Sequence, residues 1–155
     1  MAVLRSEGGA LDLASVMVGV LVIGIVGGVI AATVFAVIPW SQDRAARGGL
    51  DAVKTSESVQ YGQSAGNGVG KFMVDADLSG TTNATGAVLM QASPRIKVAV
   101  SANGQHYVGA SASETGTVFY ISENGQAPAT TAPVTGTGDA ATVAPIWDNV
   151  TKTWS

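Results

Sequence analysis

A run of 28 residues without a charged side chain, from Leu13 to Trp40, constrains this 155-residue chain more than any other feature of its sequence. About 20 predominantly apolar residues suffice for a helix to cross the hydrocarbon core of a membrane. The apolar part of a cleaved secretory signal is shorter, roughly 7–15 residues. We therefore expect a transmembrane helix. Pro39 can kink or end it, and Trp40 suits a membrane–water interface.

Small residues recur every four positions within this run. Because that spacing places residues on one face of a helix, they form a stripe along which helix backbones can approach closely in lipid. The stripe consists of Gly24, Gly28, Ala32 and Ala36. It predicts helix–helix packing in an oligomer, although Gly and Ala are also simply common in membrane helices.

The pattern continues beyond the apolar run as an amphipathic helix over residues 41–61. The expected apolar stripe comprises Ala45, Ala46, Leu50 and Val53. Charged residues, Glu57 among them, are expected to surround it, and the Gly48-Gly49 pair weakens a helix. We predict one long helix from about Leu11 to Tyr61, bent or softened at Pro39 and at the glycine pair. Residues 10–40 would form its membrane or filament-core part.

The C-terminal part shows three strand signals with alternating apolar residues, over 95–101, 106–112 and 117–122. Asn-Gly pairs and a Glu-Thr-Gly turn separate or close them, which favours an antiparallel meander. So small a sheet needs a cover for its apolar face, and the helix around Leu50 and Val53 is available. We therefore predict an α+β fold: a long N-terminal helix packed on a small antiparallel sheet. Residues 62–125 would form this β domain, beginning with a flexible link at 62–70.

Residues 126–155 are predicted to form a tail. The segment 126–145 is rich in Pro, Thr, Ala and Gly and is expected to be extended or disordered. The terminal residues 146–155 could add a strand anchored by Trp147 and Trp154, or could contact another subunit.

Composition excludes several functional classes. The net charge is −3 and the sequence contains no basic patch, which argues against nucleic acid as a specific partner. The absence of cysteine excludes disulfides and thiolate metal sites. One histidine, His106, lies in a predicted strand, and no nucleophile motif accompanies it. We therefore do not expect an enzyme, and we expect no obligatory cofactor.

Two weaker motifs lie in predicted loops. Asp75, Asp77 and Ser79 resemble the first half of a calcium-binding loop, but position twelve holds Gly86 instead of the bidentate Glu. A polar turn is therefore favoured over a calcium site. Asn83 and Asn149 each begin a triplet that fits N-glycosylation.

The N-terminus carries a resemblance to a known family. A short polar leader with Arg5 and Glu7 precedes Gly8 and Gly9, and an acidic residue, Asp12, stands just before the long Val/Ile/Gly helix. This arrangement resembles a type IV prepilin with a divergent leader. In the family the acidic residue is usually a Glu, the fifth residue after the cleavage site, and a Phe precedes it. Here Asp12 is the fourth residue after a cut at Gly8 or the third after a cut at Gly9.

The resemblance implies a leader over residues 1–9 that a prepilin peptidase removes after Gly8 or Gly9. The same enzyme would methylate the new amine of Gly9 or Ala10. Asp12 would neutralise the amine of a neighbouring subunit, because a carboxylate among apolar helices is costly unless it is paired. The spacing around "YV" and "FYIS" is also similar to small Gram-positive pilins.

The function implied is structural. The precursor would lie in the cell membrane, and assembly machinery would then build it into an extracellular surface filament, a helical homopolymer suited to cell adhesion. Alternatives are a minor pilin or a pseudopilin of a secretion or DNA-uptake system. A further alternative is an uncleaved single-pass membrane protein whose β domain binds a partner. Arg44, Arg47 and Lys54 follow the apolar run, a bias that by itself favours a cytoplasmic C-terminal domain.

Overall fold

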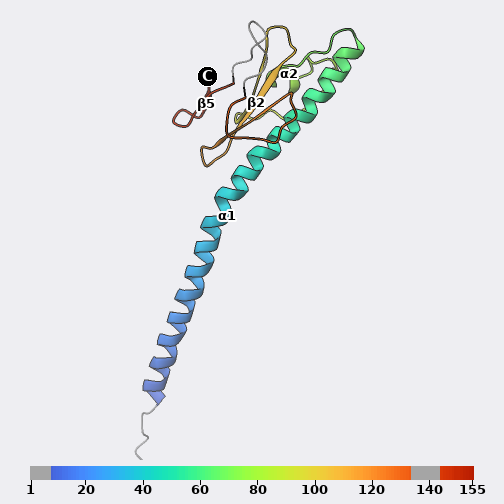
Figure 1. Cartoon of the computed structure of the whole chain (residues 1–155). Helices are drawn as coiled ribbons and strands as arrows, with labels where there is room; N and C mark the ends of the chain where they lie inside the picture. Colours follow the sequence, from blue (N-terminus) through green and yellow to red (C-terminus); the bar gives the residue numbers. More distant parts are fainter. Residues whose placement is uncertain (1–7, 134–143) are drawn as a thin grey trace, which may run out of the picture. The chain divides into compact units, whose positions relative to one another are not determined.

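The computed structural model describes residues 8–133 and 144–155, with side chains from Leu13 onward. The chain divides into two compact units, one ending at Trp40 and one covering Ser41–Ser155. Helix α1 (Gly8–Gly66) contributes its first part to the first unit and its remainder to the second. The fold is α+β, as predicted: a long N-terminal apolar helix whose later part contacts a three-stranded antiparallel sheet (Figure 1).

Helix α1 is longer than the predicted span of Leu11 to Tyr61 and remains helical through Pro39 and the glycine pair. Its extension to Gly66 corrects the prediction of a flexible link beginning at residue 62. The Ser64 hydroxyl explains the extra turn, because it accepts a 2.7 Å hydrogen bond from the Lys71 N–H and so ties the helix end to the chain that follows. Gly49 also has a packing role, since a Cβ there would lie 2.9 Å from the Ile96 Cδ1 atom.

The sheet has the order β1-β2-β3, formed by β1 (Ile96–Val100), β2 (Tyr107–Ala112) and β3 (Val118–Ser122). Each strand lies within the range predicted for it. The register pairs Val98 with Gly109 and Gly109 with Ile121. The turns after the three strands contain Gly104, Gly116 and Gly125, with φ angles of 72°, 88° and 71°. A left-handed backbone of this kind favours glycine, which explains why the Gly-containing signals located the turns.

The core lies between the later part of α1 and one face of the sheet. Leu50 and Val53 are fully buried. The apolar face predicted for β1 belongs to the same core: Val98 is buried in it, and Ile96 and Val100 pack against it. A Cβ on Gly109 would lie 3.1 Å from the Val53 Cγ1 atom, so the central strand approaches the helix closely. The buried set of this core comprises Ala46, Leu50, Val53, Leu78, Met90, Val98, Tyr107, Phe119 and Ile121. Ala45, by contrast, is exposed, which corrects the predicted stripe at one position.

The segment between α1 and β1 was expected to be a loop, and it is instead anchored by polar side chains of the helix. Glu57 Oε2 accepts a hydrogen bond from the Met73 N–H (3.1 Å), and Gln60 Oε1 accepts one from Ala84 (2.8 Å). The Ser56 hydroxyl donates to the Leu89 carbonyl (2.9 Å). This segment also contains a short helix, α2 (Asp75–Leu78), whose Leu78 is fully buried. The β domain is therefore held to α1 by polar as well as apolar contacts.

The C-terminal residues form a second, two-stranded sheet of β4 (Trp147–Asp148) and β5 (Thr153–Trp154). These residues form a hairpin of their own and add no strand to the main sheet; the Trp147 and Trp154 ring centroids lie 4.9 Å apart, and Trp154 Nε1 donates to the Pro94 carbonyl (3.1 Å). Within the preceding tail, Ala129 pairs with Tyr120 beside β3. Much of the segment predicted to be extended or disordered lies outside the described residues.

Candidate assembly helix

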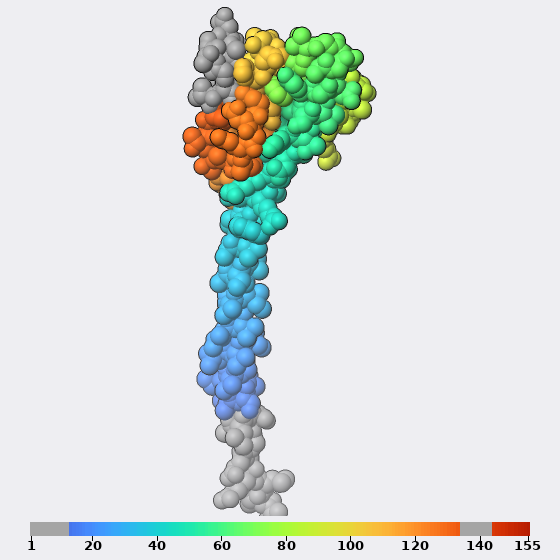
Figure 2. Space-filling view, turned by 45° about the vertical axis from the view of Figure 1, so that its right-hand side comes forward, coloured from blue at the N-terminus to red at the C-terminus, as the bar shows by residue number. Residues whose placement is uncertain are grey.

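The part of α1 between Leu13 and Trp40 exposes all of its large apolar side chains. Their exposed fractions run from 43% at Ile38 to 75% at Phe35. Figure 2 shows them in blue shades, projecting from the helix on the face in view. By length and composition α1 can cross a membrane, and its most apolar window has a mean hydropathy of 2.7 with none of it buried. In water such a surface is strongly unfavourable, and an apolar helix of this kind at the N-terminus is typical of membrane insertion or of a signal sequence.

The predicted small-residue stripe lies on this exposed segment. A Cβ added at Gly24 or at Gly28 would meet no atom within 4 Å, and Ala32 and Ala36 are exposed. The hydroxyl of Thr33 donates to the Ile30 carbonyl (2.8 Å), so the helix satisfies this polar group itself. Internal satisfaction of polar groups suits an apolar environment. The stripe is therefore not covered by any described part of this chain, and its role in helix packing stays a prediction.

The processing residues of the predicted leader lie at the start of α1. Gly8 is the first helical residue, and Gly9, Ala10 and Asp12 lie in the first turns. The side chain of Asp12 and residues 1–7 lie outside the described part of the chain. Cleavage, methylation and the pairing of Asp12 with a neighbouring amine therefore remain predictions.

The first charged side chains after the apolar run are tied to the folded domain. Asp43 Oδ1 accepts a hydrogen bond from Thr115 Oγ1 (2.8 Å). Hydrogen bonds from Ser113 and Thr115 hold the pKa of Asp43 below its usual range. The Arg47 guanidinium lies over the Phe119 ring, 4.5 Å from its centroid. The charges that follow the apolar run thus bind the sheet and its turns, where they help to hold α1 against the domain.

The residues of the candidate calcium motif engage other protein groups. Asp75 Oδ1 pairs with Lys97 Nζ (3.1 Å) and accepts from the Val98 N–H (3.2 Å). Asp77 Oδ1 accepts from Thr82 Oγ1 (2.8 Å). Among the described residues, no group of three or more His, Cys, Asp or Glu side chains is placed to hold a metal ion. In the structure Asp75 covers the outer edge of β1 through its bond from the Val98 N–H.

Asn83, one of the two candidate glycosylation residues, organises the loop before β1. Its side chain is 6% exposed, and its Nδ2 donates to the carbonyls of Asp77, Gly80 and Ala87 at 3.0, 3.0 and 2.7 Å. Its Oδ1 accepts from the N–H and the hydroxyl of Thr85. A glycan could therefore be attached to this nitrogen only if the loop were open.

We predict that Asn83→Asp destabilises the domain by about 3 kcal/mol, because three carbonyl oxygens would then face a buried carboxylate instead of a donor. The measurement is denaturant unfolding of the full chain in detergent micelles. The matched control is Asn124→Asp in the exposed turn after β3, which should cost only about 0.5 kcal/mol. Equal losses for the two variants would contradict the loop-organising role of Asn83.

Asn149 lies in an exposed turn, as predicted, whereas His106 was predicted to lie in a strand and instead immediately precedes β2. Asn149 is exposed, accepts from Trp147 Nε1 (3.1 Å) and donates to the Gly116 carbonyl (3.3 Å), so it links the hairpin to the β2–β3 turn. His106 Nδ1 lies 2.9 Å from Glu123 Oε1. The Glu123 carboxylate also accepts from the Tyr107 N–H (3.3 Å), which gives this pair a structural place between β2 and β3.

Glu57, like Ala45, was placed wrongly by sequence reasoning. It was expected on the charged surface of the helix and is fully buried. Its Oε1 atom has no hydrogen-bond partner, and burial raises the pKa of Glu57 to about 8, an effect only partly offset by the hydrogen bond from Met73. The signal was present in the spacing, because Leu50, Val53, Glu57 and Gln60 recur at helical intervals on one face.

Comparison with family models, with curated proteins and with solved structures finds no match for this chain. The architecture itself is pilin-like: a long apolar N-terminal helix continues into a domain where it packs on a small antiparallel sheet.

Proposed function

We propose that this chain is a structural subunit of a type IV pilus-like extracellular filament. The observation that carries the proposal is α1 itself. Its residues 13–40 expose every large apolar side chain, and the same helix supports a folded α+β domain. Lipid would cover the apolar segment in the precursor, and the helices of other subunits would cover it in the filament.

The resemblance at the N-terminus supports the same proposal. The leader with Gly8 and Gly9 would be removed by a prepilin peptidase, and Asp12 would pair with the new amine of a neighbour during assembly. Pairing of this kind offsets the cost of a carboxylate among apolar helices. The partners are therefore copies of the same chain, the membrane, the peptidase and the assembly machinery. A minor pilin or a pseudopilin would use the same chemistry in smaller numbers.

The small-residue stripe gives the proposal a test. Gly28→Leu places a large side chain where a neighbouring helix would approach, so it should reduce the filament protein recovered by shearing at least tenfold. The amount of protein in the membrane should not change, since Leu is well tolerated in lipid. Shearing, immunoblotting and electron microscopy of cells that carry the cognate assembly genes provide the measurement.

The control is Val26→Leu, which adds bulk to the side of the helix away from the stripe and should leave the sheared fraction unchanged. An uncleaved single-pass membrane protein predicts a different outcome, with no chain in the sheared fraction for any variant, including the unmodified protein. Equal filament yields from Gly28→Leu and the unmodified chain would contradict packing through the stripe.

A further inference from the structure

Three asparagines of the folded domain are followed directly by a glycine: Asn67, Asn103 and Asn124. An asparagine in this setting can lose its side-chain amide without an enzyme. The reason is that glycine has no Cβ to hinder the approach of its backbone nitrogen to the side-chain carbonyl carbon. The neighbouring residue thus makes all three asparagines candidates for this modification, and the structure distinguishes between them.

Asn103, in the turn between β1 and β2, is held at both of the groups that would react. Its Oδ1 accepts hydrogen bonds from the Ser101 hydroxyl (2.7 Å) and from the Gln105 N–H (3.0 Å). The nitrogen that would attack, that of Gly104, donates to the Ser101 carbonyl at 2.8 Å. Ser101 is buried. Attack requires the amide carbon and this nitrogen to move together, which breaks bonds that are costly to lose in a buried setting.

Asn67, in the turn after α1, and Asn124, in the turn after β3, lack these restraints. Both are exposed, and within the described part of the chain neither side chain has a hydrogen-bond partner. The attacking nitrogens would be those of Gly68 and Gly125, which each donate to a backbone carbonyl at 3.2 Å, a longer bond than that of Gly104. A Cβ at Gly68 would meet no atom within 4 Å, so this turn has room to rearrange.

We infer that Asn67 and Asn124 are sites of spontaneous deamidation in the folded protein, whereas Asn103 is protected. The backbone nitrogen of the following glycine forms a bond to the side-chain carbonyl carbon and gives up its proton. The bond from that carbon to the amide nitrogen breaks, and the proton leaves with it as part of ammonia. A cyclic imide remains, and water then opens it at either carbonyl carbon to give aspartate or isoaspartate. Water is the one co-reactant, and no atom is oxidised or reduced.

The folded domain can carry the products at both sites. Each event replaces a neutral amide by a carboxylate and makes the net charge one unit more negative. At Asn124 the new charge lies near Lys54, whose Nζ donates to the Gly125 carbonyl at 3.1 Å, and an opposite charge nearby favours the ionised product. Asn67 lies outside the sheet and the helix–sheet core. The inference does not depend on the proposed filament function.

The test is a time course of peptide mass spectrometry on the full chain in detergent micelles at mildly alkaline pH. Each deamidation raises the mass of its peptide by about one dalton. Asn67 and Asn124 should react at least about tenfold faster than Asn103, because reaction at Asn103 requires a local opening that breaks several hydrogen bonds. Asn67→Gln and Asn124→Gln should each remove one of the two fast reactions and leave the other, since glutamine would have to form a larger ring.

The matched control is the same chain unfolded in concentrated urea. Each asparagine is followed by glycine, so the three rates should become similar once the turn hydrogen bonds are lost.

Each other outcome overturns a stated part of the inference. Equal rates at all three asparagines of the folded chain would overturn the protection of Asn103. A folded chain in which Asn67 or Asn124 stays intact, over a time that suffices for reaction in urea, would overturn the assignment of that residue. A slow Asn103 in urea as well would show that its neighbours in sequence set the rate, and would overturn the argument from its hydrogen bonds.

Discussion

Glu57→Gln is expected to stabilise the folded domain at pH 8–9 and to flatten the dependence of its stability on pH. The buried Glu57 carboxyl has a pKa raised from 4.5 to about 8 by desolvation. The folded state therefore binds this proton more tightly than the unfolded state does. As pH rises from 4.5 towards 8, the unfolded chain ionises freely and the folded chain does not, so stability falls.

The size of the effect follows from the pKa difference. Each unit corresponds to about 1.4 kcal/mol, so ionisation of this buried group costs on the order of 3–5 kcal/mol at alkaline pH. Its contribution is most favourable below the unfolded pKa and is lost as pH passes through about 8. A glutamine retains an oxygen that can accept from the Met73 N–H and never ionises.

Urea unfolding of the full chain in detergent micelles at pH 5, 7 and 9 measures this directly. Asp51→Asn, on an exposed position of the same helix, is the matched control and should change stability by less than about 0.5 kcal/mol at each pH. The interpretation would be contradicted if Glu57→Gln kept the full pH dependence of the unmodified protein.

Phe119→Ala is expected to destabilise the domain by about 3–5 kcal/mol, the usual loss when a buried phenylalanine leaves a cavity. Phe119 is 1% exposed in the core and lies beneath the Arg47 guanidinium. A loss of this size is a large fraction of the roughly 5–15 kcal/mol by which most domains are stable. The variant should therefore unfold at much lower urea concentration and accumulate poorly in cells.

The size-conserving variant Phe119→Leu separates packing from other effects. It keeps most of the apolar volume and should cost under about 1.5 kcal/mol. The two variants are compared by their urea midpoints in the same micelles. If Phe119→Ala were as stable as Phe119→Leu, the helix–sheet core described here would not be what holds the domain together.

The three strands of the main sheet could be predicted from the sequence because their determinants are local. Apolar alternation places Ile96, Val98 and Val100 on one face, and glycines with positive φ end each strand. The long helix was equally clear from its 28 uncharged residues. In each case neighbouring residues alone specify the backbone. The long helix could also be predicted to cover the sheet, because the sequence offers no other apolar helix face.

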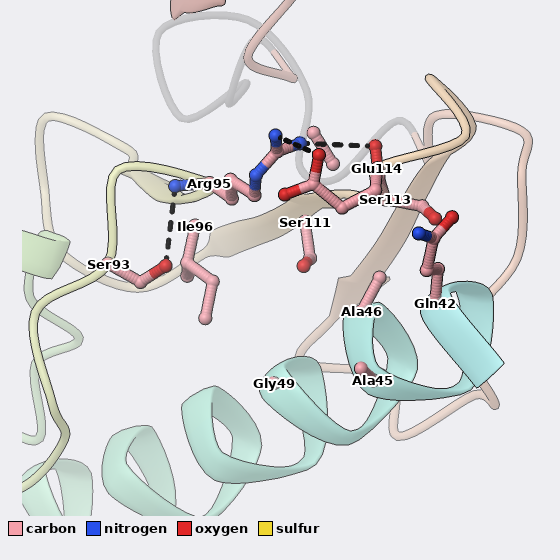
Figure 3. A pocket seen from close by; sticks show the side chains of 11 residues that line it. Gln42, Ala45, Ala46, Gly49, Ser93, Arg95, Ile96, Ser111, Ser113 and Glu114 are labelled. Atoms are coloured by element: carbon pink, nitrogen blue, oxygen red, sulfur yellow. Dashed lines mark hydrogen bonds and ion pairs between the residues drawn. The ribbon is translucent and has the colours of Figure 1, made fainter. Parts of the chain in front are cut away.

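The polar anchoring of the loop before β1 could not be predicted in the same way. The burial of Glu57 and Gln60 depends on partners 16 and 24 residues away, Met73 and Ala84, while Asn83 is buried by a loop that closes around it. A charged or amide side chain is normally assigned to the surface, and here helical spacing with Leu50 was the better guide. The pocket between α1 and β1, which Gly49 and Ile96 help to line (Figure 3), depends on the approach of helix and strand, which no local pattern specifies.

The central proposal is that the chain is processed and built into a filament, and the mass of its N-terminus tests this most directly. Intact mass and N-terminal sequencing would be done on protein from sheared surface material and from membranes. We predict a form that begins at Gly9 or Ala10, one methyl group heavier than the bare chain and enriched in the sheared fraction. A chain that begins at Met1 and is confined to the membrane would contradict the filament and leave α1 as a permanent anchor.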